Sequence, residues 1–305
     1  MAQQTPWPAL ELEGCRDTLT TLQLYAQVIG KLQLALTPSQ AGWANAPLRL
    51  TPRGIASKVL WPDERSLSIG FDLIVHQLRF ELSDGTRRAL LLEPRSVADF
   101  YAAVMTTLVE LGVEVTIDPT SVETAAPVSL SADTGHGSYD RACVGELFQA
   151  WTRVAAVFDR FRSGYCGRQT PVDLWWGTFD LSVVRYSGRA ASPPFDSGAI
   201  ERAAMEAEQS LVGFWPGDDA SPAPVFFSYI YPKPAGIEAA TVTPPGAQWS
   251  AEAGEFIVSY DTIRRSADPA RALLGFCEST YGAGSRLAGW DRATLDRRPT
   301  ADRIA

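Results

Sequence analysis

Hydrophobic and polar positions along the chain follow two periods, and together they predict a protein of mixed helices and strands. Apolar residues recur at helical spacing in the segments 16–36, 96–111, 140–162 and 269–281. Apolar and polar residues alternate as in strands in the segments 47–55, 58–62, 66–74, 77–83, 87–93, 113–117, 225–231 and 255–260. A short helix is expected at 198–209, and turns are expected to bound the aromatic run at 213–217.

The segment 170–189 holds the densest run of β-branched and aromatic residues in the chain. It predicts either two strands joined at a bend around Gly177 or one long strand with a bulge. Alternation after the bend places Phe179 on the face opposite to Asp180. We expect Trp176 and Phe179 to be buried, because each borders an apolar run beside Gly177.

The chain divides into two similar halves, 1–125 and 126–305, which we expect to pack together. The segment 118–137 is rich in Pro, Ser, Thr and Ala, has little periodicity, and is the candidate boundary. In each half, a long helix precedes a strand that proline opens and glycine breaks; further strands and a helix follow. We therefore expect an α+β fold of two similar halves, each an antiparallel sheet with helices against one face.

Two spacings suggest that the halves arose by internal duplication. Pro47 and Pro171 open matching strand patterns and lie 124 positions apart. Tyr25 and Trp151 lie 126 positions apart in the preceding helices. The alternative is that two mixed segments of helix and strand match in this way by chance.

Composition narrows the classes of function. With 305 residues, 46% of them hydrophobic, the chain can bury a large core. Its net charge is −8, and no stretch combines a basic patch with aromatic residues, so we expect no nucleic-acid partner. The nine Trp, nine Tyr and 13 Phe suit either an aromatic-lined pocket or simply an aromatic core.

The sequence also indicates where the protein acts. Residues 1–12 lack a basic region followed by an apolar run, and no apolar segment approaches membrane-spanning length. The four cysteines, Cys15, Cys143, Cys166 and Cys277, have no CxxC spacing. We therefore expect reduced thiols in a cytoplasmic protein that does not enter a membrane.

Common catalytic motifs are absent. The chain has no GxGxxG, P-loop, HExxH or GxSxG pattern, and it has only two histidines. We therefore expect neither a bound cofactor nor a bound metal. A lone Cys166 without a nearby basic partner is a weak candidate for a nucleophile.

His136 is the first candidate catalytic residue. It lies between Gly135 and Gly137, which permit a ligand to approach closely, and just before a helix whose N-terminus favours an anion. Tyr139 adds a phenol to this group. The alternative is a simple helix cap, in which Asp140 satisfies backbone donors.

His76 is the second histidine and lies on or near a strand. Alternation places Asp72 on the same face, where its carboxylate could orient the imidazole as a base. The alternative is a structural histidine at the end of a packed strand. Long apolar neighbours on both sides favour that alternative.

Charged and aromatic residues in the second half complete the candidate site. Asp180 is a candidate catalytic carboxylate. Arg185 and Arg189 could clamp an anionic ligand through paired hydrogen bonds, or they could pair with carboxylates of the chain. The candidate walls of the pocket are Trp176, Trp215 and Tyr229.

Several short motifs stand out along the chain: G-K-L-Q-L-A-L at Gly30, E-P-R-S-V-A-D-F-Y at Glu93, H-G-S-Y-D at His136, W-G-T-F-D-L at Trp176, Y-S-G-R at Tyr186, G-F-W-P-G at Gly213 and E-S-T-Y at Glu278. From Trp7 to Asp291, the chain resembles a bacterial family known as domain of unknown function 5996. The resemblance implies no activity. It does imply further histidines near Trp43 and Ala207, where this chain has Ala44 and Ala207, so any chemistry of those histidines is lost or altered here.

These observations predict a soluble enzyme that acts by acid–base chemistry on a small, partly hydrophobic organic acid. The pocket would lie where the two halves meet. The alternatives are a non-catalytic protein that binds a ligand or a protein partner, and a structural subunit. No feature of the sequence sets an oligomeric state.

Overall fold

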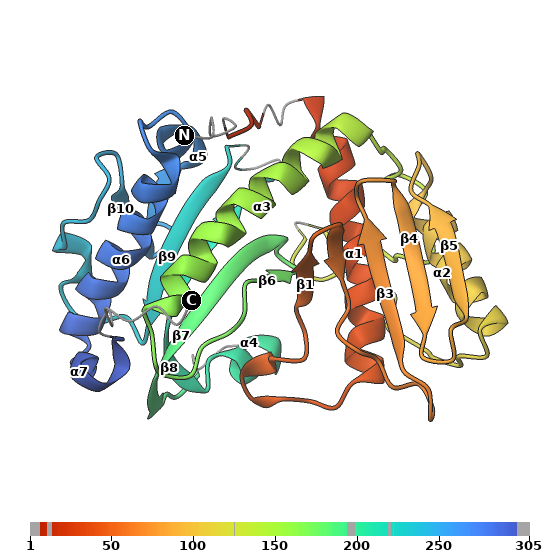
Figure 1. Cartoon of the computed structure of the whole chain (residues 1–305), viewed down its shortest axis with the longest axis horizontal. Coiled ribbons are helices and arrows are strands. Elements are labelled where there is room, and N and C mark those ends of the chain that lie inside the picture. Colours follow the sequence, from red (N-terminus) through yellow and green to blue (C-terminus); the bar gives the residue numbers. More distant parts are fainter. Residues whose placement is uncertain are drawn as a thin grey trace, which may run out of the picture.

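The strands of the computed structural model form one antiparallel sheet. The structure describes residues 7–10, 14–124, 126–193, 199–218, 221 and 223–297. Within these residues, the sheet has eleven strands in the order β10-β11-β9-β8-β7-β6-β1-β2-β3-β4-β5 (Figure 1). The expected mixture of helices and antiparallel strands is confirmed. The two expected sheets are instead joined into one, because β1 pairs with β6.

The elements follow one another in two series. The first series is α1 (Arg16–Leu36), η2 (Ala41–Trp43), β1 (Leu48–Thr51), β2 (Gly54–Ala56), β3 (Leu67–Asp72), β4 (Gln77–Leu82), β5 (Arg87–Leu91) and α2 (Val97–Glu110). The second series is α3 (Arg141–Ser163), β6 (Asp173–Trp175), β7 (Asp180–Ala190), α4 (Ala199–Ala204), β8 (Ala207–Trp215), β9 (Val225–Tyr231), η3 (Ile237–Ala239), β10 (Gln248–Ser250), β11 (Glu255–Ser259), α5 (Tyr260–Arg264), α6 (Pro269–Leu287) and α7 (Arg292–Leu295).

One face of the sheet is covered by helices along its whole width. Leu48 lies opposite Leu174, and Leu174 lies opposite Leu181, so these fully buried side chains share a face. Figure 1 shows α1 and α2 behind β3–β5, but α3 and α6 in front of β7–β9. The sheet therefore twists strongly between its halves, and no helix of the described residues packs over the strands on its other face. We call this other side the open face.

The predicted bend at Gly177 is a hairpin turn between β6 and β7. Trp176 and Phe179 lie in this turn with 4% and 2% of their surface exposed, so their predicted burial is confirmed. The Trp176 indole donates to the Ala46 carbonyl at 2.8 Å. A side chain at Gly30 would overlap the Trp176 ring, so glycine in α1 makes room for it.

Several predicted strand positions were wrong. The segments 58–62 and 113–117 are not strands, although Val113 and Ile117 are buried at alternating positions. In 58–62, only Leu60 forms an antiparallel bridge, with Leu67. In 113–117, the alternating burial comes from packing against the core. The helix expected at 198–209 ends at Ala204, and its last residues instead begin strand β8, whose first residues, Ala207–Ser210, are largely polar. Part of the expected polar tail, 298–305, lies outside the described residues.

The prediction that all cysteines are reduced was also wrong. Cys15, next to the start of α1, forms a disulfide with Cys143 in the first turn of α3. Cys166 is free and exposed, and Cys277 is free and buried. The expected cytoplasmic location loses part of its support, because disulfides are uncommon in reducing compartments.

Candidate functional site

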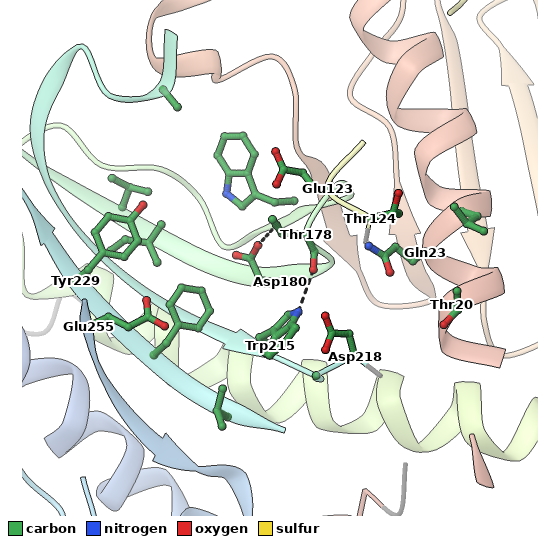
Figure 2. Close-up of a pocket in the computed structure, with 18 of the residues that line it drawn as sticks. Thr20, Gln23, Glu123, Thr124, Thr178, Asp180, Trp215, Asp218, Tyr229 and Glu255 are labelled. Atoms are coloured by element: carbon green, nitrogen blue, oxygen red, sulfur yellow. Dashed lines mark hydrogen bonds between the residues drawn. The ribbon is translucent and has the colours of Figure 1, made fainter. Parts of the chain in front are cut away.

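A cavity of about 810 Å³ lies on the open face of the second half of the sheet. Its floor is formed by residues of β7, β8, β9 and β11, and its sides by residues of α1 and of the segment 123–128 (Figure 2). A volume of this size fits an organic molecule of moderate size. We call this cavity the pocket.

Strand alternation explains which side chains reach the pocket. Leu211 on β8 lies opposite Tyr229 on β9, and both point to the open face. Trp215, four residues after Leu211, shares that face. The Phe227 ring lies directly over Gly213, where any side chain would overlap it. The glycine therefore lets an aromatic ring form part of the floor.

Asp180 is the first residue of β7 and is one of the most buried charged residues of the pocket, with 7% of its surface exposed. It follows Phe179, whose φ of 66° is unusual for a residue with a side chain. The Thr178 hydroxyl donates to its carboxylate (Figure 2). The pKa of Asp180 is raised to about 6, mainly by burial and also by the charge of Glu123, while the hydrogen bond from Thr178 opposes the shift.

Glu255 is the second carboxyl group of the pocket floor and begins β11. Burial, together with the charge of Asp180, raises its pKa to about 7. Figure 2 shows Glu255 beside Tyr229, on the side of the pocket away from α1. Two carboxyl groups with pKa values near neutrality can each donate or accept a proton at neutral pH.

Side chains from distant parts of the chain hold the hairpin turn in place. Gln23 of α1 donates to the Gly177 carbonyl at 2.6 Å. The Trp215 indole donates to the Thr178 carbonyl at 3.1 Å (Figure 2). Both bonds act on the residues just before Asp180. The position of the Asp180 carboxylate is therefore fixed by α1 and β8 as well as by its own strand.

The side wall of the pocket is fixed in a similar way. Gln27 of α1 donates to the Val122 carbonyl at 2.8 Å and accepts from the Val122 backbone N–H at 2.9 Å. The next residue, Glu123, is exposed, lines the pocket and has a φ of 53°. A Cβ atom at Gly177 would lie 3.1 Å from the Glu123 side chain. Glu123 is thus held against the hairpin turn.

His136 also lines the pocket, with its side chain 40% exposed. Its Nδ1 atom lies 2.7 Å from a carboxylate oxygen of Asp133. Glycine is needed at position 137 for packing, because a Cβ atom there would lie 3.0 Å from the Arg95 carbonyl oxygen. The segment that approaches this backbone closely is part of the protein itself, so Gly137 is no argument for a ligand.

Tyr139 is not brought together with His136. Its side chain is buried, and its hydroxyl lies 3.0 Å from Nδ1 of His76. Burial raises the pKa of Tyr139 and lowers the pKa of His76. Neither residue is among the described residues that line the pocket. Their contact links the segment just before α3 to the turn between β3 and β4.

The arginines do not form the expected anion clamp. Arg185 lies on the helix-covered face, donates to the Phe161 carbonyl, and places its guanidinium 3.4 Å from the Phe161 ring centre and 4.5 Å from that of Tyr281. Burial lowers its pKa to about 10. Arg189 pairs with Glu208 at 2.7 Å outside the pocket. Trp176, another expected wall residue, packs into the core instead.

The pocket therefore has a different character from the one expected. Asp180, His136, Trp215 and Tyr229 do line it, but their roles stay predictions. Among the described lining residues there are four carboxylates and no lysine or arginine; the carboxylates belong to Glu123, Asp180, Asp218 and Glu255. An organic acid would meet negative charge there, which argues against the expected anionic substrate.

The sequence pattern of a family of unknown function, DUF5996, matches residues 7–297. The chain belongs to this family. No curated protein and no solved structure shows significant similarity to it. Membership of DUF5996 assigns no activity to the pocket.

The two places where the DUF5996 resemblance implied extra histidines meet beside the pocket. The Gly42 backbone N–H, next to Trp43, donates to the Glu206 carboxylate, next to Ala207, at 2.8 Å. Gly42 and Ala204 both line the pocket.

Within the described residues, no group of three or more His, Cys, Asp and Glu side chains could hold a metal ion. No described helix is both long enough and apolar enough to cross a membrane.

Proposed function

We propose that this DUF5996 protein binds a small, partly hydrophobic molecule in the pocket, and that Asp180 and Glu255 exchange protons with it. The observation that carries the proposal is the presence of two carboxyl groups, with pKa values of about 6 and about 7, in one aromatic-walled cavity. Such values are favourable for general acid–base catalysis at neutral pH. His136, at the edge of the pocket, is a further candidate for proton exchange.

A screen of small molecules by thermal shift tests whether the pocket binds a ligand. Leu211→Trp should fill the pocket and abolish stabilisation by true pocket ligands. Val109→Trp introduces the same side chain at an exposed position of α2 and should change nothing. Circular dichroism confirms folding, and Phe227→Ala, which removes part of the floor, gives a second variant. The absence of any compound that distinguishes Leu211→Trp from wild type would contradict ligand binding.

A second measurement separates an enzyme from a binding protein. Pocket ligands are incubated with wild type, Asp180→Asn and Glu255→Gln, and the products are followed by mass spectrometry. An enzyme should convert a ligand at a rate that depends on both carboxyl groups. Binding without conversion of any pocket ligand would support the alternative of a non-catalytic ligand-binding protein.

We also propose that the two halves arose by duplication, with the boundary at residues 125 and 126. Each half runs outward from the central β1–β6 pair as a series of neighbouring antiparallel strands, between a preceding and a following helix. Tyr25 and Trp151 are 126 positions apart, as are Leu48 and Leu174 at the centre of the sheet. In a crystal structure, superposing the two halves should match the helices and at least three strands, and a different strand path would contradict duplication.

For location and partners, we propose a soluble cytoplasmic protein without a nucleic-acid partner. The net charge of −8 supports the absence of a nucleic-acid partner. Trapping of thiols in freshly broken cells tests the location. A fully bridged Cys15–Cys143 pair in that experiment would indicate an oxidising compartment instead.

A further inference from the structure

Two buried aspartates on the open face of the same sheet differ in their partners. Asp72, at the end of β3, is 3% exposed and accepts from Arg53 at 2.5 Å and from Arg79 at 2.9 Å. Burial alone would raise its pKa, but the bond from Arg53, backbone donors and the Arg79 charge lower it. The chain itself therefore supplies the cations that stabilise this carboxylate.

Asp180, the first residue of β7, lies on the same open face without such cations. It is 7% exposed, and no described lysine or arginine forms an ion pair with it. Its charged neighbours across the pocket, Glu123 and Glu255, are also acidic. Ionising these groups together without a positive partner is unfavourable in a buried site.

Aromatic rings surround these carboxyl groups. Trp175, Trp215 and Phe227 line the pocket, and ring faces attract cations. A fourth lining ring, Tyr186, already has the Arg168 guanidinium 4.1 Å from its centre. The same chain already encloses a cation in aromatic rings on its other face, where Arg185 lies over Phe161 and beside other rings. Acidic groups combined with aromatic faces are the chemistry that recognises an organic ammonium group.

We infer that the molecule in the pocket is an organic cation, with an ammonium group near Asp180 and Glu255 and an apolar body against the aromatic rings. The inference rests on the proposed function, because it assumes that the pocket is occupied. The ligand would supply the positive charge that Arg53 and Arg79 supply to Asp72. Its binding would also favour the ionised carboxylates and release protons.

Three probes with one skeleton and different charges test the inference. Phenethylamine is a cation, 2-phenylethanol is neutral, and phenylacetate is an anion at pH 7.5. Isothermal titration calorimetry on the full chain should give phenethylamine an affinity about tenfold or more above that of 2-phenylethanol, with phenylacetate the weakest. Proton uptake by the buffer should accompany binding of the cation alone.

Substitutions test whether the affinity for the cation depends on the two carboxyl groups of the pocket. Asp180→Asn and Glu255→Gln should each lower the affinity for phenethylamine about tenfold and leave that for 2-phenylethanol nearly unchanged. Glu81→Gln removes one negative charge from an exposed site on β4 and should leave both affinities unchanged. Equal affinities for the three probes, or no measurable binding of phenethylamine, would overturn the inference. The proposed function would fall only if the pocket-filling variant also left every hit of the screen unaffected.

Discussion

Each half of the sheet has a buried aspartate on the open face, but the two aspartates have opposite charge environments. In the first half, Asp72 is held by Arg53 and Arg79, and its pKa is lowered. In the second half, Asp180 lies in a cavity with Glu255, and its pKa is raised to about 6. Strand order alone therefore does not reveal function; the difference lies in which charges the neighbouring strands supply.

The largest expected effect concerns the seam between the halves. Trp176 belongs to the second half, and its buried ring packs on Gly30 of the first half. Trp176→Ala removes this ring. The free energy of unfolding should fall by about 3–5 kcal/mol, because a large buried ring is lost. Denaturant titration measures this change. A loss well under 1 kcal/mol would mean that the ring is not part of the core.

The next prediction concerns Asp180 and pH. A carboxyl group whose pKa is higher in the folded protein than in the unfolded chain destabilises the fold as pH rises from about 4 to about 6, and the loss persists above that range. Asp180→Asn should therefore raise the free energy of unfolding at pH 8, by up to about 3 kcal/mol, and change it little at pH 4. Denaturation at the two pH values checks this, and an equal effect at both would contradict it.

Asp72→Asn should have the opposite effect on the free energy of unfolding and lower it at high pH. The lowered pKa of Asp72 means that it stabilises the fold above its unfolded pKa and loses this effect as the pH falls through its folded pKa. Asp72→Asn should cost about 1–2 kcal/mol at pH 8, because two partly exposed arginines lose their partner. If both substitutions stabilised the protein, the proposed contrast between the halves would be mistaken.

The smallest expected effects concern the two histidines. His76→Ala removes a bond to buried Tyr139 and should lower Tm by roughly 2–4 °C. His136→Ala, at a partly exposed side chain, should leave Tm nearly unchanged and weaken the binding of pocket ligands. Thermal melts measure Tm for both variants, and titration with a ligand from the screen measures the affinity of His136→Ala. An unchanged affinity in His136→Ala would remove this residue from the site.

Strand alternation could have located part of the site. Asp180 and Arg185 lie five positions apart on one strand, so alternation already places them on opposite faces. The expected meeting of these two side chains in one cavity conflicted with that rule. The buried hairpin at Trp176 and Phe179, and the long helices, did follow from periodicity.

Other parts of the site depend on contacts that no local pattern contains. Gln27 holds Val122, 95 positions away, and Gln23 holds Gly177, 154 positions away. Glu255 lies on a strand that was predicted, but its place beside Asp180 depends on the curvature of the whole sheet. Long-range arrangement, rather than local propensity, determines these neighbours.

The Cys15–Cys143 bridge changes what a single cut in the backbone can do. The bridge joins residues 128 positions apart and closes the first half, together with the segment 118–137, into a covalent ring. A protease that cleaves within that segment would open the ring without producing two separate molecules. The disulfide would keep the two fragments linked, so they would separate in electrophoresis only after a reductant was added.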